Sequence, residues 1–176
     1  PMLMAGEAGV GGVGALKAGD GQGSHWIGYV VVSDLDATLA AAEAAGGKIK
    51  VPAFDIPDVG RSAVVTDPNG AVFSPLEPAT AEDMLPKGDW GPGRFCWWEL
   101  VTKDPAGAQA FYGQVIGWGC HEVDMGGRPY WLWLKGDEAM NPGGLMKHPE
   151  DADPAFWLYY VLVPDVDAAT ARVDGL

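Results

Sequence analysis

The sequence predicts an α+β fold built from paired β-α-β-β-β modules, and two observations lead to this prediction. Residues 25–38 and 156–169 share one scaffold, HWIGYVVVSDLDAT against FWLYYVLVPDVDAA, in which Trp26 matches Trp157. Between these matched segments the pattern of strand, helix and further strands occurs twice. The underlying period is therefore about 65 residues, a length that suits one such module.

Composition limits the class of protein. The 176 residues are 48% hydrophobic and 20% charged, as in a globular protein, and no apolar run approaches the length of a membrane span. A net charge of −13 would be repelled by nucleic acid and by anionic membrane surfaces. Cys96 and Cys120 lack the spacing of a zinc site and are expected to be half-buried thiols. The sequence thus predicts a cytoplasmic protein with neither a nucleic-acid nor a membrane partner.

The first module is read from its turn and cap residues. Ser33-Asp34 can cap a helix that runs to Ala45, where Gly46-Gly47 ends it. The turn Asp67-Pro68-Asn69-Gly70, with apolar residues on both sides, predicts a β-hairpin. The predicted strands are Gly11–Lys17, His25–Val32, Lys48–Val51, Arg61–Thr66 and Ala71–Leu76.

The second module repeats this plan. Residues 79–93 are polar and rich in glycine and proline, which is typical of a linker. Asp104-Pro105 begins a helix that ends near Gly117, and Asp165 begins a last helix. The predicted strands are Arg94–Thr102, Trp118–Val123, Pro129–Leu134, Asn141–Lys147 and Phe156–Val163. The paired glycines at 11–12, 46–47, 126–127 and 143–144 are expected at turns and strand edges, and none begins a phosphate loop.

The domain division follows from the period. Residues 1–22 are expected to be the last strand of a truncated preceding module, residues 23–78 one module, 79–93 a linker, 94–148 a second module and 149–176 the start of a truncated following module. The chain is thus expected to be a window from a longer tandem protein. Because the terminal pieces would leave open strand edges, we expect them to dock together, within one chain or between two copies as a homodimer.

Three stretches carry a family resemblance, WWELVTKDPAGAQAFYGQVIGW, YVVVSDLDATLAAAEAAGGKI and DIPDVGRSAVVTDPNGAVFSPLEP. They resemble the vicinal-oxygen-chelate superfamily, which includes glyoxalase I, bleomycin-resistance proteins and extradiol dioxygenases, and within it the tandem glyoxalase-like proteins. The resemblance implies that paired modules curl their sheets into a cup-shaped half-barrel. For the enzymes it also implies a divalent metal, bound by a histidine on a module's first strand and a glutamate on its last.

The positions of these metal ligands can be inspected one by one. The first-strand position holds Ile27, Trp97 and Leu158 in the three modules, and the last-strand position after the Asp67 turn holds Ser74. The strand 143–147 contains no acid. A divalent metal needs several converging His, Asp or Glu side chains, so the sequence predicts no metal site and no cofactor.

The three histidines of the chain are the other possible metal ligands. His25 lies near the rim of its strand, His121 and Glu122 point to opposite faces of theirs, and His148 follows a strand in a polar loop. Each histidine is more simply a solvated or hydrogen-bonded structural residue. Metal ligands drawn from His25, His121 or Glu99, or from missing modules, would make the chain a metal-dependent lyase or dioxygenase.

Glu99 is the candidate catalytic residue. It stands in an apolar stretch and is predicted to share a strand face with Trp97 and Val101. If buried in the cup, its pKa should rise, and it could act as a general base or bind a substrate amine. A hydrogen-bonded structural role is the alternative.

The candidate ligand-binding residues are mainly aromatic, as suits a cavity for a flat or apolar molecule. Alternation puts Trp131 and Trp133 on one strand face and Tyr130 on the other. Arg61 could meet a ligand carboxylate, or form a surface ion pair with Asp55 or Asp58. The candidate set is Trp97, Trp131, Trp133, Tyr29, Arg61, Ser74 and His25, and the alternative for the aromatic residues is the core.

These observations favour a small-molecule-binding glyoxalase-like protein that holds a small organic molecule without the usual catalytic metal. The bleomycin-resistance branch of the superfamily implies that such binding is compatible with the fold. The alternatives are a metal-dependent lyase or dioxygenase and a catalytically inert interaction protein. Whether the chain is an enzyme stays open on sequence alone, because one fold supports many activities.

Overall fold

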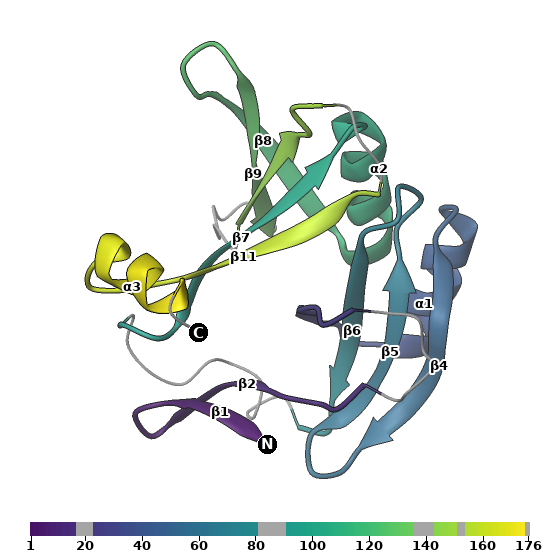
Figure 1. Cartoon of the computed structure of the whole chain (residues 1–176). Helices are drawn as coiled ribbons and strands as arrows, with labels where there is room; N and C mark the ends of the chain where they lie inside the picture. The colour runs from purple at the N-terminus through teal and green to yellow at the C-terminus, as the bar shows by residue number, and fades with distance from the viewer. Residues whose placement is uncertain (17–22, 81–90, 136–142, 151–153, 175–176) are drawn as a thin grey trace. The chain divides into compact units, whose positions relative to one another are not determined.

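The computed structural model describes residues 1–16, 23–80, 91–135, 143–150 and 154–174 (Figure 1). The chain divides into two compact units. The terminal unit comprises Pro1–Trp26, Pro86–Trp97 and Tyr159–Leu176, and the central unit comprises Ile27–Leu85 and Trp98–Leu158. The division falls within two strands, β7 (Phe95–Thr102) and β11 (Phe156–Val161), which contribute residues to both units.

The first module of the central unit forms a four-stranded sheet in the order β3-β6-β5-β4. Its elements are β3 (Tyr29–Val31), α1 (Leu35–Ala44), β4 (Lys48–Ile56), β5 (Gly60–Thr66) and β6 (Val72–Pro78). The predicted strand Lys48–Val51 was too short, because β4 continues through Pro52 to Ile56. Proline is tolerated there since β4 lies at the sheet edge and has two irregularities in its pairing with β5.

The second module has the same strand order, β7-β10-β9-β8, and β11 joins the sheet beside β7. Its elements are β7, α2 (Pro105–Ile116), β8 (Trp118–Asp124), β9 (Pro129–Lys135) and β10 (Gly143–Lys147). As predicted, Asp104 caps α2, with its carboxylate accepting from the Gly107 amide at 3.0 Å. Gly117 ends α2 in the left-handed conformation, with φ of 73°, which glycine adopts without steric cost.

The internal repeat is confirmed at the helix caps. Asp34 precedes α1 and accepts a hydrogen bond from the Ala37 amide at 2.8 Å. Asp165 precedes α3 (Val166–Val173) and accepts from the Ala168 amide at 2.9 Å. Both aspartates have extended backbone conformations, as N-cap residues require. The repeated sequence therefore specifies repeated local structure.

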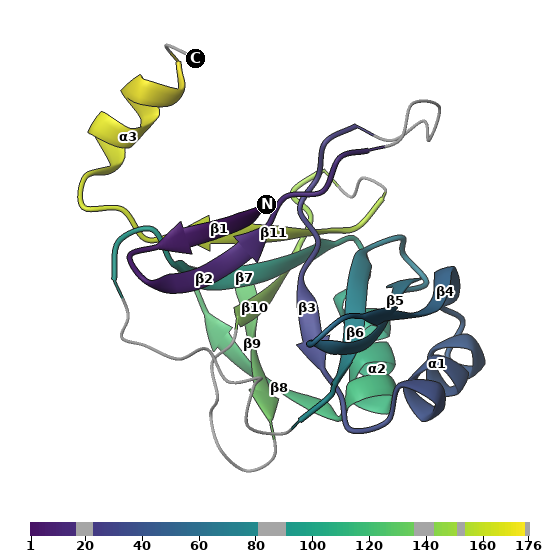
Figure 2. The same ribbon diagram turned by 90° about the horizontal axis from the view of Figure 1, so that it is seen from below.

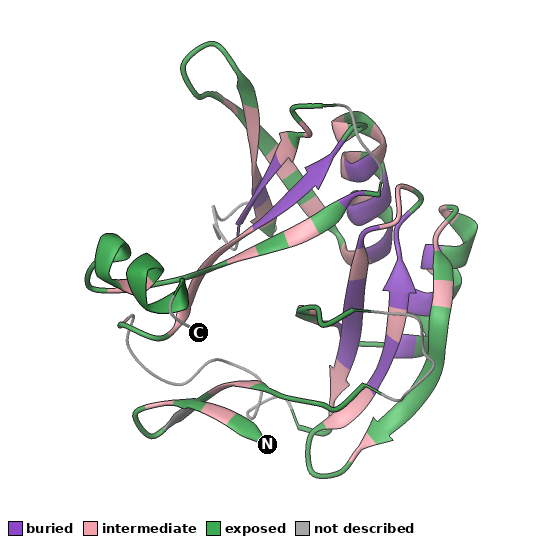
Figure 3. Cartoon of the chain, viewed as in Figure 1, coloured by how far each residue is buried: buried purple, intermediate pink, exposed green. Residues whose placement is uncertain are grey.

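The core of the central unit lies where the two modules meet. Helices α1 and α2 pack side by side (Figure 2). Phe73 of β6 contacts Phe111 and Tyr112 of α2, with ring centroids 6.3 and 5.5 Å apart. Tyr112 also contacts Trp133 of β9 at 5.5 Å, so α2 touches the sheets of both modules. The buried residues gather on α2, β5, β6 and β7 (Figure 3).

The terminal unit begins with a hairpin of β1 (Met2–Ala5) and β2 (Ala8–Gly12). The predicted strand Gly11–Lys17 was therefore placed too late, since strand structure ends at Gly12. In the same unit Phe95 makes edge-type ring contacts with Trp26 and Tyr159. Among the described helices none is both long and apolar enough to cross a bilayer.

The glycine pair at 143–144 lies at the start of a strand, and that strand is inside the sheet. Gly143 and Gly144 begin β10, which lies between β7 and β9 inside the sheet. A Cβ at Gly143 would overlap the Trp98 carbonyl, and one at Gly144 would overlap the Tyr130 hydroxyl. The pair is thus required by close approach of neighbours rather than by a turn. Gly126 and Gly127 do lie in a turn, with positive φ.

Candidate functional site

The second sheet has one face against α2 and one facing away. On the helix side, Leu100, Leu145 and Trp131 occupy aligned positions of β7, β10 and β9 and belong to or contact the hydrophobic core. The opposite side is called the open face below. One row of it crosses four strands and consists of Glu99, Gly144, Leu132 and His121.

Tyr130 lies over the middle of the open face. It is aligned with Met146 of β10, one row away from Gly144. The lack of a side chain at Gly144 leaves the space that the Tyr130 hydroxyl occupies. Glu99 is the neighbour of Gly144 in β7 and is only 7% exposed. The structure therefore places a buried carboxyl residue on β7 and a phenol residue on β9, on either side of β10, on the same open face.

A pocket of about 410 Å³ opens where the β8–β9 hairpin turn meets the end of β10. Below it is called the hairpin pocket. It is lined by Met125, Arg128, Pro129, Tyr130, Met146, Lys147, His148 and Pro149. Two of these residues, Tyr130 and Met146, also belong to the open face. The pocket therefore extends the open face toward a group of basic residues.

The predicted tryptophans Trp131 and Trp133 share one strand face, and Tyr130 lies on the other, as alternation predicts. The face that the tryptophans share is the helix side. Trp133 is fully buried, and its indole N–H donates to the Gly144 carbonyl at 3.0 Å. The indole N–H of Trp131 donates to Glu122 at 3.2 Å. Trp133 is a core residue and Trp131 is half-buried against the core, so both lie on the core side of the sheet.

Ser74 occupies the position of the last-strand metal ligand and is buried. Its hydroxyl donates to the Ala63 carbonyl at 2.7 Å and lies 2.9 Å from the Ser62 hydroxyl. Tyr29 is its neighbour in β3 and is 54% exposed. The serine is thus part of a hydrogen-bonded pair that joins β5 to β6.

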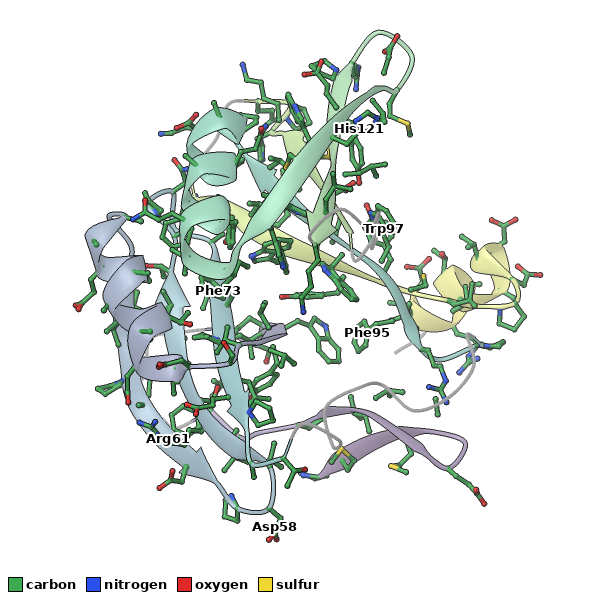
Figure 4. All side chains as sticks on the ribbon, turned by 180° about the vertical axis from the view of Figure 1, so that it is seen from behind. Asp58, Arg61, Phe73, Phe95, Trp97 and His121 are labelled. Carbon is green, nitrogen blue, oxygen red and sulfur yellow. The ribbon has the colours of Figure 1, made fainter. Side chains whose placement is uncertain are left out.

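Arg61 is engaged by two carboxylates. Its guanidinium contacts Asp36 of α1 at 3.1 Å and Glu77 of β6 at 3.5 Å, and Figure 4 shows it on β5. The predicted pair with Asp55 or Asp58 was wrong: the strand register aligns Arg61 with both Asp55 of β4 and Glu77 of β6, and the guanidinium pairs with Glu77 and with Asp36 of α1. The hydrogen bond and charge of Asp36 raise the pKa of Arg61. A second pocket of about 410 Å³ beside it is lined by Asp55, Ile56, Asp58, Gly60, Arg61, Glu77, Pro78 and Ala79.

The other predicted residues are dispersed. Trp97 and His25 belong to the terminal unit, where Trp97 is half-buried and the exposed His25 has its Nδ1 2.9 Å from the Gly23 carbonyl. His121 is exposed on β8 (Figure 4). His148 accepts a hydrogen bond at Nδ1 from the Glu150 amide at 3.1 Å. Of these four residues, only His121 and His148 lie in the same unit as Glu99.

The residues present do not fit the metal set of the resembled enzymes. Within the described part of the chain, no three His, Cys, Asp or Glu residues are grouped so as to hold a metal ion. Glu99 and His121 face the same way but lie three strands apart, which is roughly 14 Å at the usual spacing of strands. Zinc–ligand bonds are about 2 Å long, so these two side chains do not share an ion.

Sequence reasoning did not select Tyr130, Met146, Arg128 or Lys147 as site residues. Strand alternation did separate Tyr130 from Trp131 and Trp133, which was the available signal. Which of the two strand faces is open depends on where α2 packs. Because α2 contacts the sheet through residues distant in sequence, alternation alone does not identify the open face.

Comparison with family models gives no match for this chain. A curated Mycobacterium tuberculosis protein named "Putative glyoxylase CFP32" is 32% identical over 155 residues, covering 88% of this chain and 58% of that protein. The anthracycline biosynthesis protein DnrV of Streptomyces peucetius is 30% identical over 152 residues, covering 86% of this chain and 54% of the relative. The chain thus spans a little over half the length of these relatives.

Among solved structures, the chain is similar to 2,2',3-trihydroxybiphenyl 1,2-dioxygenase from Sphingomonas wittichii strain RW1. The TM-score is 0.53 at 17% identity, covering 83% of this chain and 56% of the dioxygenase. At this identity the likeness concerns the fold alone. The repeated β-α-β-β-β modules, the shared strand order and these relatives agree, and the chain belongs to the vicinal-oxygen-chelate superfamily.

Proposed function

We propose that this chain is a small-molecule-binding member of the superfamily that holds its ligand on the open face of the second sheet without a divalent metal. The absence of a divalent metal from this proposal rests on the hydrogen bonding of Ser74. At the place where a metalloenzyme of the superfamily has a glutamate, a buried serine is engaged by Ala63 and Ser62. A neutral hydroxyl held in this way is a poor ligand for a divalent metal.

The open face supports binding because it combines polar and apolar groups. Glu99 of β7 provides a carboxyl group in a nearly buried position, and Tyr130 of β9 provides a phenol on the other side of β10. Met146 and Leu132 provide apolar surface beside them. Ligand sites commonly have this character, a mainly apolar surface with a few well-placed polar groups. In this proposal Glu99 binds an amine or hydroxyl of the ligand, or acts as a general base toward it.

An enzymatic function is the second candidate, and the name of the mycobacterial relative favours it. In that case the chain would be a glyoxalase-like lyase or a dioxygenase. Its metal ligands would include His25, His121 or Glu99, or would come from modules outside this chain. The two functions differ in metal content, which makes them separable by direct measurement.

Metal analysis of the purified chain, expressed with added Fe, Mn, Ni and Zn, tests the metal-free proposal. We expect well below one equivalent of any metal, unchanged in Glu99→Gln and His25→Ala. Stoichiometric metal that disappears in either variant would show that the enzyme alternative is right and the metal-free proposal wrong.

Ligand binding is tested in the chelator-treated protein by the melting temperature. A ligand that binds only the folded state raises the melting temperature with its concentration. Screening small aromatic acids and amines should yield such ligands, and Glu99→Gln should reduce the shift for those with an amine or hydroxyl. Glu122→Gln is the matched control, since Glu122 is exposed and bonds Trp131 on the helix side. If no compound raises the melting temperature, an inert interaction protein is the better description.

A further inference from the structure

We propose that the hairpin pocket binds the carboxylate of a small aromatic acid, with Arg128 and Lys147 as its anion-recognition residues. This inference rests on the proposed function, because it names the class of ligand and the part of the site that selects it. The pocket lies at the edge of the open face and shares Tyr130 and Met146 with it.

The charge of the pocket lining contrasts with that of the chain. The chain carries 24 acidic residues and only 11 lysines and arginines. The pocket lining nevertheless includes Arg128, Lys147 and His148 and no acidic residue. A locally cationic concavity in an acidic protein favours an anionic ligand over a neutral one.

The position of Arg128 is fixed by the hairpin turn. The Met125 amide donates to the Arg128 carbonyl at 3.0 Å, which closes the turn. The Asp124 carboxylate accepts from the Gly127 amide at 2.6 Å, and Gly126 and Gly127 have positive φ that glycine accommodates. The turn backbone is therefore held before any ligand binds, which lowers the entropic cost of ordering it.

The opposite wall is also fixed. The His148 amide donates to the Thr102 carbonyl at 2.8 Å, and the ring packs edge-on against Phe156 with centroids 6.1 Å apart. Because Nδ1 accepts from the Glu150 amide, the neutral ring carries its proton on Nε2. His148 thus contributes a positioned imidazole ring to a lining that also contains the two basic side chains.

The remaining lining suits a flat apolar group. Tyr130 offers a ring that can stack, and Met125 and Met146 offer thioethers that make favourable contacts with aromatic rings. The volume of about 410 Å³ lies within the range of small-molecule pockets, roughly 300–1,000 Å³.

The equally large pocket beside Arg61 provides an internal contrast. Its lining includes Asp55, Asp58 and Glu77, and its only basic residue is Arg61, which already pairs with Asp36 and Glu77. An incoming carboxylate would meet negative charge there. Of these two pockets, the hairpin pocket is the one suited to an anion.

Binding of 2-naphthoate, compared with the neutral isostere 2-naphthamide, tests the proposal. Methionine-methyl NMR of the full chain reports the location, since the chain has six methionines and two line the pocket. We expect 2-naphthoate to shift the Met125 and Met146 signals saturably. The amide should bind at least about fivefold more weakly, because it lacks the charge that Arg128 and Lys147 recognise.

Arg128→Gln and Lys147→Gln should each weaken 2-naphthoate binding by about three- to tenfold, and naphthamide binding much less. Lys48→Gln is the matched control, because it removes the same charge at an exposed site on β4. It should leave the affinity unchanged. Arg128 is exposed on a turn, so its replacement should not impair folding, which circular dichroism can verify.

The proposal is overturned if the acid and the amide bind equally, if the Met125 signal does not respond, or if Lys48→Gln weakens binding as much as Arg128→Gln. A ligand that raises the melting temperature equally in wild type and Arg128→Gln would leave the proposed function standing and remove this site. Stoichiometric metal combined with Arg128-dependent binding would leave this site standing and overturn the metal-free proposed function.

Discussion

The hydroxyl of Tyr112 on α2 donates to the carboxylate of Asp67, which begins the turn between β5 and β6, over 3.4 Å. The same hydroxyl accepts from the indole N–H of Trp157 on β11 at 3.2 Å. Asp67 also accepts from the amides of Asn69 and Ala71, both at 2.9 Å. One buried polar chain thus connects the first module, the helix of the second module and the strand that follows.

Replacing Tyr112 by phenylalanine should destabilise the fold by about 1–3 kcal/mol, because the buried Asp67 and the half-buried Trp157 each lose a hydrogen bond. The measurement is urea denaturation followed by fluorescence. Tyr29→Phe, at a 54% exposed position, should change the free energy of unfolding little and serves as control. Equal stability of the two variants would mean that the buried chain contributes nothing.

Asp67 should make stability depend on pH. Burial raises the pKa of Asp67 above its ordinary value of 3.8, while the backbone hydrogen bonds oppose the rise. The folded state therefore binds the proton more tightly than the unfolded state. The stabilisation by this proton is fully present below pH 3.8 and is lost as the pH rises through the folded pKa.

Comparing Asp67→Asn with the wild type from pH 3 to pH 7 checks this sign. The free energy of unfolding of the wild type minus that of the variant should increase as the pH falls from 7 to 3. A difference that moves the other way would mean that hydrogen bonding outweighs burial at this carboxylate.

Alanine at Gly143 should destabilise the protein more than alanine at Gly144. At Gly143 the new methyl group meets the Trp98 backbone, which cannot move independently of the sheet. At Gly144 it meets the side chain of Tyr130, which can rotate away. We expect about 1–3 kcal/mol for Gly144→Ala and more for Gly143→Ala, measured by thermal or urea denaturation.

Gly119→Ala is the control for both, since its Cβ would be 3.7 Å from Leu134, an ordinary contact. The double variant Gly144→Ala, Tyr130→Ala should recover part of the loss of Gly144→Ala. Without recovery, the overlap with Tyr130 would not be the cause.

Trp133 and Trp131 should differ in what their replacement changes. Trp133→Phe leaves a cavity at a fully buried site and removes the donor to the Gly144 carbonyl, so we expect a loss of about 2–4 kcal/mol. Trp131→Phe, at a half-buried site, should cost less. Since both tryptophans lie on the helix side, neither replacement should reduce ligand affinity under conditions where the protein stays folded. Loss of binding in folded Trp133→Phe would return this residue to the ligand site.

Cys120 should be an unreactive thiol. Burial raises its pKa to about 11, so little thiolate exists near neutral pH. In a Cys96→Ser variant, which leaves Cys120 alone, iodoacetamide labelling at pH 8 should be much slower than that of a free cysteine peptide. The rate should keep rising to pH 10, and a plateau near pH 9 would contradict the raised pKa.

The helices, most strands and the repeat were predictable from the sequence because short-range interactions determine them. Asp34, Asp104 and Asp165 each cap a helix by binding an amide three residues ahead. Alternation likewise separated Tyr130 from its neighbours on β9, since strand geometry is local. The predictions failed where a boundary depended on a partner, as in β4, which extends because β5 pairs with it as far as Gly60.

Only the tertiary structure decided which surfaces and partners these elements have. Arg61 and Asp36 are 25 residues apart in sequence, and Tyr112 and Asp67 are 45 apart. The sequence placed Trp131 and Trp133 on one face, but the packing of α2 made that face the core and left Glu99 and Tyr130 on the other. The physical reason is that a local pattern defines two faces of a strand, whereas long-range packing determines which face is buried.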